Sequence, residues 1–238
     1  MISIFSRYMY VHTFRYSTES NLAVSCGSVD VVDRKNIRNV SEIVIHPAFI
    51  QDSTGISDPN KASNVGLLFL EEEYELNADL NVVCLPTTSD DKDFLPETCI
   101  ATGFGERPAF QGLGDFADEM KALPIPIITN SECESWILKL LGANFKVHNS
   151  QLCAGVKGSF ESDTCTGDGG SPLVCNKKSD PNTFVQMGLV SARLSDAECG
   201  TSSIPGIYSN IADSMCMIKA IVQHVVWYSI CFRILNIL

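Results

Sequence analysis

The sequence has few basic side chains, and this shortage restricts the partners that the protein can bind. Its 238 residues include 17 Lys and Arg against 28 Asp and Glu, so the formal net charge at pH 7 is −11. Such a charge argues against nucleic acids, heparin-like polymers and anionic membranes as partners, and it leaves basic protein surfaces. Internal repeats and low-complexity tracts are also absent. With 45% hydrophobic and 19% charged residues, the chain is globular and long enough to bury a sizeable core.

Cysteine, in contrast, is abundant, with ten residues. Their spacing lacks the tight pairs of zinc sites, so we predict disulfides, no metal and an oxidising, extracellular location. The N-terminus disagrees with that location, because Met1–Arg7 has no long apolar run and does not resemble a signal peptide. We therefore interpret the chain as a fragment or as the product of a mis-started gene model.

Local patterns predict mostly short strands. Apolar runs between turn signals indicate strands at 22–27, 40–45, 65–70 and 120–128. Apolar residues at helical spacing predict a helix over 130–141, with Ser131 as its cap. Residues 87–96, which contain three Asp and end at Pro96, indicate a linker between two halves.

One segment, Cys165-Thr-Gly-Asp-Gly-Gly-Ser-Pro-Leu-Val-Cys175, says most about function. It resembles the nucleophile loop of the chymotrypsin/trypsin-like serine proteases, which reads C-x-G-D-S-G-G-P-L-V-C, and nine of its eleven positions match. The run Cys99-Ile-Ala-Thr-Gly-Phe-Gly105 resembles the C-x-x-T-G-W-G strand of the same family.

Further features narrow the resemblance. The predicted helix, the Leu141-Gly-Ala-Asn-Phe-Lys-Val-His148 loop and the Gly-Asp-Gly-Gly-Ser-Pro loop resemble the arthropod clip-domain serine protease homologues, which include the prophenoloxidase-activating cofactors. The resemblance implies an all-β fold of two packed antiparallel six-stranded β-barrels with a C-terminal helix over 211–222. It divides the chain into a first barrel without its opening strands, a second barrel with the helix, and an apolar tail, at 1–95, 96–222 and 223–238.

The resemblance also locates a Ser-His-Asp catalytic triad, and two of its three positions have lost their chemistry. Gly169 stands in place of the nucleophilic serine, and Ser171 follows two residues too late. Asn64 takes the place of the aspartate, where an amide favours the wrong histidine tautomer and cannot stabilise an imidazolium. A shifted alignment would place Val65 there instead. His12 is either the base or a histidine in unrelated sequence.

The pocket that would select a substrate side chain is half retained. Its implied positions are Asp163, Ser191, Ala192, Arg193 and Gly206. Asp163 is the residue that gives trypsin-like members their preference for Lys or Arg. Arg193 replaces a glycine of the pocket wall, and we expect it to pair with Asp163 and close the pocket, or to point into solvent.

Two further roles in the loop follow from the resemblance. The backbone N–H groups of Gly167 and Gly169 form an oxyanion-hole-like pair, which without a nucleophile would be an anion pocket. Asp168 corresponds to the aspartate that binds the cleaved N-terminus in active members. Without that N-terminus it must stay exposed or pair with another cation.

The resemblance implies three disulfides in the second barrel, which are Cys99–Cys175, Cys133–Cys153 and Cys165–Cys199. Cys84 corresponds to the cysteine that links the protease domain to an upstream light chain or clip module. In the absence of that module, Cys84 is expected to be free or cross-linked to another molecule. Asn39-Val-Ser41 is an N-glycosylation sequon, which has meaning only in a secreted chain.

The resemblance therefore implies a non-catalytic protease homologue without a cofactor. Its role would be that of a binding or regulatory cofactor in an extracellular innate-immune cascade leading to melanisation, with a cascade protease or zymogen as partner. The alternatives are an active trypsin-like endopeptidase and a non-functional truncated fragment. The tail at 223–238 is too short for a membrane span and is interrupted by His224 and Arg233.

Overall fold

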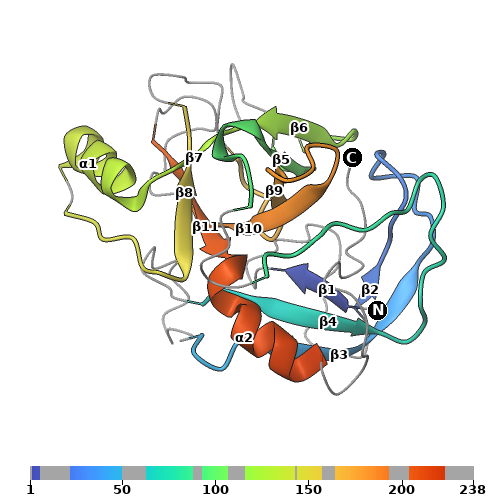
Figure 1. The fold of residues 1–238 in the computed structure, drawn as a ribbon. Helices are drawn as coiled ribbons and strands as arrows, with labels where there is room; N and C mark the ends of the chain where they lie inside the picture. Colours follow the sequence, from blue (N-terminus) through green and yellow to red (C-terminus); the bar gives the residue numbers. More distant parts are fainter. Residues whose placement is uncertain are drawn as a thin grey trace.

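The strands form two antiparallel sheets that lie side by side, with α2 across the junction between them (Figure 1). The computed structural model describes residues 2–5, 22–49, 63–87, 93–106, 116–142, 144–156, 164–192 and 204–222. The predicted all-β fold with one C-terminal helix is confirmed. Among the described residues, no helix is both long enough and apolar enough to cross a bilayer.

The first sheet has four strands in the order β1-β4-β3-β2. They are β1 (Ile2–Phe5), β2 (Ala23–Val24), β3 (Arg38–Ile45) and β4 (Gly66–Leu70). Alternate residues of β4 point to opposite faces, because side chains along a strand alternate. Leu68 therefore packs with Val40 and Tyr74 inside the first half, whereas Leu67 joins a core shared with the second half.

The second sheet has seven strands in the order β6-β5-β9-β10-β11-β8-β7. They are β5 (Cys99–Gly103), β6 (Lys121–Pro124), β7 (Ile127–Ile128), β8 (Gln151–Ala154), β9 (Pro172–Asn176), β10 (Phe184–Ala192) and β11 (Gly206–Asn210), and a 3₁₀ turn, η2 (Pro96–Thr98), precedes β5. The single strand predicted over 120–128 is wrong, because Pro124 and Pro126 cannot donate to a ladder. The run divides into β6, which pairs with β5, and β7, which pairs with β8. The sheet thus curls, and its two edge strands, β6 and β7, follow each other in the sequence.

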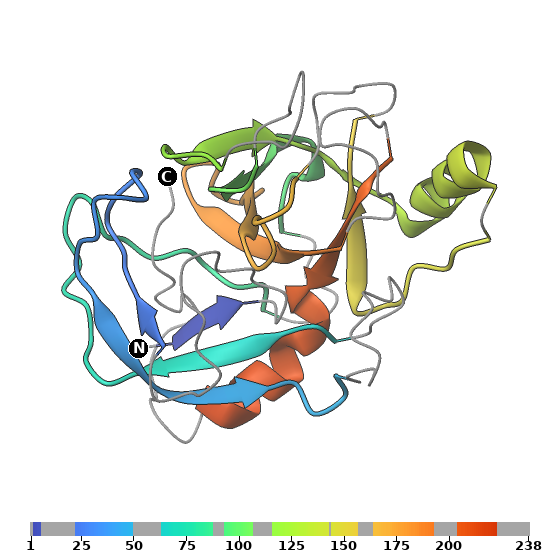
Figure 2. The ribbon, with the colours of Figure 1, turned by 180° about the vertical axis from the view of Figure 1, so that it is seen from behind.

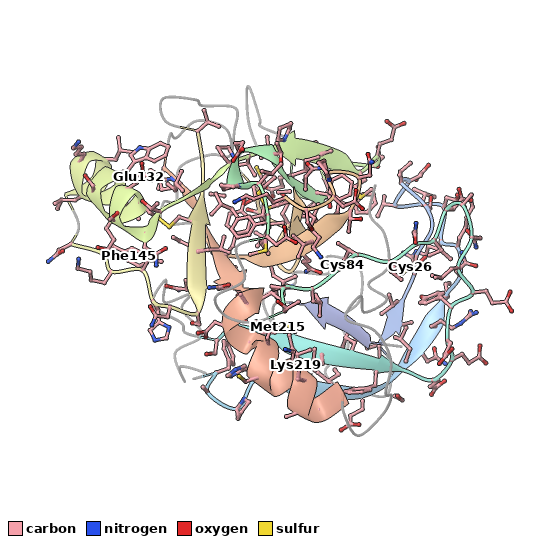
Figure 3. All side chains as sticks on the ribbon, viewed as in Figure 1. Cys26, Cys84, Glu132, Phe145, Met215 and Lys219 are labelled. Carbon is pink, nitrogen blue, oxygen red and sulfur yellow. A yellow bond between two sulfur atoms is a disulfide. The ribbon has the colours of Figure 1, made fainter. Side chains whose placement is uncertain are left out.

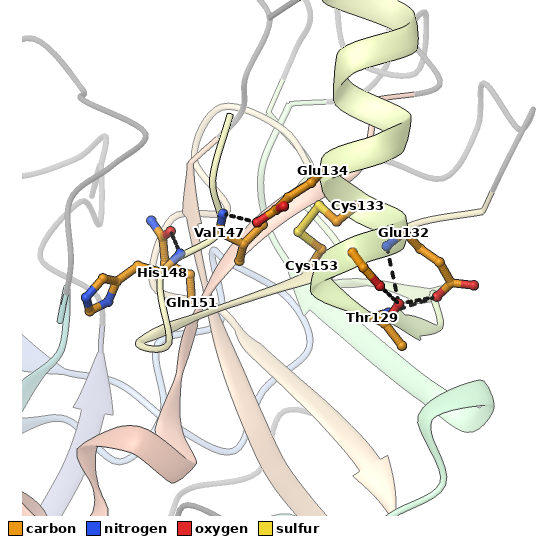
Figure 4. The surroundings of a disulfide bond; sticks show 9 residues. Thr129, Glu132, Cys133, Glu134, Val147, His148, Gln151 and Cys153 are labelled. Atoms are coloured by element: carbon orange, nitrogen blue, oxygen red, sulfur yellow. Dashed lines mark hydrogen bonds between the residues drawn. A yellow bond between two sulfur atoms is a disulfide. The ribbon is translucent and has the colours of Figure 1, made fainter. Parts of the chain in front are cut away.

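Helix α1 (Asn130–Leu141) matches the predicted range, but its cap is not the predicted Ser131. Thr129 has an extended backbone, and its Oγ1 accepts the Glu132 N–H at 3.3 Å while Glu132 Oε2 accepts the Thr129 N–H at 3.1 Å (Figure 4). This reciprocal capping box satisfies two backbone donors at once. The Cys133–Cys153 disulfide then fastens α1 to β8, and the helix projects from one end of the molecule (Figures 1 and 4).

Helix α2 (Ile211–Val222) begins directly after β11 and packs on β10. Seen from behind, β3 and β4 lie in front of it, so it covers one face of the first sheet (Figure 2). Its apolar side chains Ile211, Met215 and Ile218 contact Leu67 of the first sheet and Leu189 of the second within one core. The Lys219 ammonium also donates to the Thr87 carbonyl, which ties the helix to the start of the linker (Figure 3 labels Met215 and Lys219).

Two disulfides join described cysteines, Cys99–Cys175 and Cys133–Cys153, with S–S distances of 2.03 and 2.01 Å. These are two of the three pairs that the resemblance implies. Cys199, the implied partner of Cys165, lies outside the described residues. The expectation for Cys84 is wrong, because Cys84 is disulfide-bonded within this one chain. Cys84 is buried at the junction of the sheets (Figure 3). Its backbone forms an isolated parallel β-bridge with Val185 of β10.

Candidate functional site: a triad position without its chemistry

Asn64 lies two residues before β4 and joins the two sheets. Its side-chain Nδ2 donates to Ser191 Oγ on β10 at 3.0 Å, and its backbone carbonyl accepts from Ser209 Oγ on β11 at 2.7 Å. Asn64 is 1% exposed. An amide at this place is a hydrogen-bond donor toward the second sheet, whereas an ionised carboxylate could only accept. The side chain therefore serves as a neutral connection between the halves.

The backbone before Asn64 is held in an uncommon conformation. Ser63 has a φ of 57°, which is the left-handed region, and its N–H donates to Ser150 Oγ at 2.8 Å. His148 Nδ1 lies 2.8 Å from the same Ser150 oxygen. This Ser–His contact does not form a nucleophile and base that a substrate could reach, because Ser150 is 1% exposed and its oxygen already accepts the Ser63 N–H. We did not predict this network, whose serines carry no distinctive local signal.

The loop over 164–171 is fixed to β10 by its backbone. The Gly170 N–H donates to the Val190 carbonyl, and the Val190 N–H donates to the Ser171 carbonyl, both at 2.8 Å. Gly170 has a φ of 88°, a conformation that suits glycine. Gly169 lies at the bend that these bonds hold in place, and it presents no side chain there. The position implied for the nucleophile is therefore well formed but chemically empty.

Asp168 is largely buried and is held by backbone groups. Its Oδ1 accepts the Gly105 N–H and its Oδ2 accepts the Cys165 N–H, both at 2.8 Å. A Cβ on Gly103 or Gly105 would collide with this carboxyl group, so both glycines are needed to make room for it. The expectation that Asp168 stays exposed or pairs with a cation is wrong. Among the described side chains it forms no ion pair, and two N–H groups bind it instead.

Burial dominates the electrostatics of Asp168. Removal from water raises the pKa of its carboxyl group, although the N–H groups of Cys165 and Gly105 and the charge of Lys121 act in the opposite direction. The space that holds the Asp168 carboxyl group has a signal in the sequence that we did not interpret. This signal is the pair of glycines, Gly103 and Gly105, that follows Thr102. Their purpose became visible only when the loop over 164–171 was placed against them.

Ser171 and Gly167 are both packed against neighbours. The Ser171 Oγ lies on the side of Gly103, 3.0 Å from where a Cβ on that glycine would stand. Gly167 has a φ of 95°, and the ring of Phe116 lies 2.6 Å from the position of its missing Cβ. The proposed anion-binding role of the Gly167 and Gly169 N–H groups stays a prediction.

The pocket positions are described in part. Ser191 and Ala192 lie on β10, where the ladder to β11 shifts register between Val190 and Ala192. Gly206 lies under the ring of Tyr208, which is fully buried and would be 3.1 Å from a Cβ at that glycine. The other predicted site residues, His12, Asp163 and Arg193, lie outside the described residues, as does the expected pairing of Arg193 with Asp163.

The described part of the site thus provides no attacking group at Gly169 and no carboxylate at Asn64. Nor does any group of three or more potential metal-ligating side chains occur in the ranges that the structure describes. What it does provide is a rigid loop, a buried carboxyl group and a polar connection between the sheets.

Comparison with known proteins supports the relationship. The trypsin family profile matches residues 12–218. Phenoloxidase-activating factor 2 of Galleria mellonella is 31% identical over 203 residues, covering 83% of this chain and 62% of that protein. The inactive CLIP domain-containing serine proteases A8 and A28 of Anopheles gambiae are 29% and 31% identical, over 92% and 71% of this chain and 57% and 40% of their own. The chain spans about half the length of these relatives. It belongs to the trypsin family.

Proposed function

We propose that the protein is a non-catalytic serine protease homologue that binds another protein and regulates its activity. The observation that carries this proposal is Gly169, at the bend of a loop whose backbone is otherwise fixed to β10. A trypsin-like reaction begins with a hydroxyl at that point, and glycine has none. Asn64 adds support, because an amide at the implied acid position cannot stabilise an imidazolium as a carboxylate would.

The proposed setting is an extracellular innate-immune protease cascade. Two observations support it: the two disulfides between described cysteines, and relatives named as phenoloxidase-activating factor and as inactive CLIP proteases. Disulfides persist in oxidising compartments, which fits secretion. The proposed partner is a cascade protease or its zymogen. With a net charge of −11, the chain would favour a partner with a basic surface.

A reconstituted assay tests this role. The purified, disulfide-intact chain would be added to a purified phenoloxidase-activating protease and prophenoloxidase, and oxidase activity would be followed by pigment formation. We expect activity to rise with the concentration of the chain and to saturate, because a cofactor acts by forming a complex. The same chain with reduced and alkylated cysteines is the matched control. Equal activity with and without the folded chain would reject the cofactor role.

The alternative of an active endopeptidase has no supporting observation in the described site. It would require a nucleophile other than Gly169, and the nearest serine of the loop, Ser171, packs toward Gly103. The alternative of a non-functional fragment predicts that the chain does not fold stably. Cooperative thermal unfolding of the oxidised protein would exclude that reading.

A further inference from the structure

A sequence motif on β3 has no part in the proposed function. Asn39-Val-Ser41 is the only Asn-X-Ser/Thr sequence in the chain with X other than proline. In the structure Asn39 and Ser41 are both exposed, whereas Val40 between them is 7% exposed and packs in the core of the first half. The sequon therefore presents its acceptor residue, Asn39, and its hydroxyl residue, Ser41, on the solvent face of a strand, and its middle residue anchors that strand.

The surroundings of Asn39 leave room for a substituent on its amide nitrogen. Asn39 Nδ2 donates to Glu71 Oε2 at 3.0 Å, and both side chains are exposed. A primary amide has two N–H bonds. Replacement of one hydrogen by a sugar leaves the other for Glu71, so the hydrogen bond and the modification are compatible. The backbone of Asn39 is already fixed, since its carbonyl accepts the Glu71 N–H at 3.0 Å.

We propose that Asn39 carries an N-linked glycan. The donor would be an oligosaccharide linked to a lipid diphosphate. The Asn39 Nδ2 forms a bond to the sugar C1, the bond from C1 to the diphosphate oxygen breaks, and Nδ2 loses one proton. The inference rests on the proposed function in one respect, because the chain must enter the secretory pathway to meet this donor.

The glycan would stand near the edge of the first sheet, where β2 is the outer described strand. β2 pairs with β3 through Ala23 and Val24, which face Asn39 and Arg38, and the Val40 N–H donates to the Leu22 carbonyl. Among the described residues, no strand pairs with residues 41–45 on that side. Exposed edges are sites for pairing with other chains, and bulky polar groups obstruct such pairing. The first sheet and α1 lie at opposite ends of the molecule, so a glycan here leaves α1 uncovered (Figure 1).

The site can be tested by secreting the chain from insect cells behind a heterologous signal peptide and measuring its intact mass. We expect one glycan on the wild type and on Ser41→Thr, and none on Asn39→Gln or Ser41→Ala, because the hydroxyl residue is required by the sequon. A secreted wild type that has the Cys99–Cys175 and Cys133–Cys153 disulfides but no sugar would overturn the proposal. This outcome is separate from the cofactor assay, which can be run on the unglycosylated protein.

A separate experiment tests whether the glycan protects the edge of the first sheet from aggregation. Enzymatic removal of the glycan from the folded wild type leaves every residue but Asn39 unchanged. We expect the trimmed protein to aggregate at a lower concentration than the untrimmed one, as followed by light scattering. Asn39→Gln should behave like the trimmed protein. Equal aggregation of trimmed and untrimmed protein would reject the protective role.

Discussion

The side-chain amide of Asn64 donates to the hydroxyl of Ser191 across 3.0 Å, and this bond connects residues that are 127 positions apart in the sequence. It joins the segment before β4 to the middle of the second sheet. The position that the resemblance implies for the triad aspartate thus holds an amide, and one of its N–H groups bonds to the second sheet.

Asn64→Ala should therefore destabilise the protein. The substitution removes a buried donor and leaves the Ser191 hydroxyl without it, which costs about 1–3 kcal/mol of unfolding free energy. Chemical denaturation of the oxidised protein measures the effect. The control is Asn149→Ala, an exposed asparagine whose substitution should change stability by less than about 0.5 kcal/mol. Equal effects of the two variants would contradict a structural role for the Asn64 side chain.

Asp168 should make stability fall as pH rises. Burial raises the pKa of its carboxyl group in the folded state above the unfolded value of about 3.9. Between those two pKa values the folded state binds more protons than the unfolded state, so the free energy of unfolding decreases with pH. The contribution is fully present below the unfolded pKa and is lost as pH passes through the folded one.

Other carboxyl groups act in the opposite direction, so the measurement must be a difference. Hydrogen bonds lower the pKa of Glu132, with Thr129 as the main cause, and of Asp93, with Ser179 as the main cause. Stability curves from pH 3 to pH 8 would be compared for the wild type and Asp168→Asn. Their difference should change with pH above about 3.9. A difference that is constant over the whole range would show that Asp168 does not titrate in this way.

Thr129→Ala should destabilise α1 by about 1 kcal/mol, the usual cost of losing a helix cap. The reason is its reciprocal bonding with Glu132. Ser131→Ala is the matched control, since Ser131 lies inside the helix and is exposed. Unfolding free energies of both variants, with the disulfides intact, decide between the two residues. A larger loss for Ser131→Ala would identify that residue as the cap.

Gln186→Met should stabilise the protein. Gln186 on β10 is 1% exposed, and neither Nε2 nor Oε1 has a hydrogen-bond partner among the residues that the structure describes. An unsatisfied buried polar group costs about 1–3 kcal/mol, and methionine fills a similar volume without that cost. The melting temperature of the variant should rise. A lower melting temperature would mean that the amide is satisfied in solution.

The local elements of the fold could be predicted from sequence, whereas contacts between distant segments could not. The apolar runs that became β3 and β4 and the periodic run of α1 specify their own structure. The single strand predicted over 120–128 is wrong because Pro124 and Pro126 interrupt its run of apolar residues, which divides into β6 and β7. The cap was misplaced because Ser131 and Thr129 differ in backbone conformation, which composition does not reveal.

The candidate site divides in the same way. The sequence alone predicts that Gly169 stands where a nucleophilic serine is expected, because the surrounding motif sets its register. The backbone hydrogen bonds that hold Asp168 could not be predicted from the sequence. Gly105 and Asp168 are 63 positions apart and meet only after the second sheet curls. The sequence predicts that Asp168 stays exposed or pairs with a cation. In the structure two backbone N–H groups bind its carboxyl group instead.

We expect the protein to lack peptidase chemistry, and a fluorophosphonate probe can measure this. Such a probe labels only an activated serine, so the folded wild type should remain unlabelled, as should Ser171→Ala. Trypsin at equal concentration is the positive control, and arginyl and lysyl ester substrates should be hydrolysed no faster than in buffer. Stoichiometric labelling of the wild type that disappears in Ser171→Ala would instead show that Ser171 is an activated nucleophile.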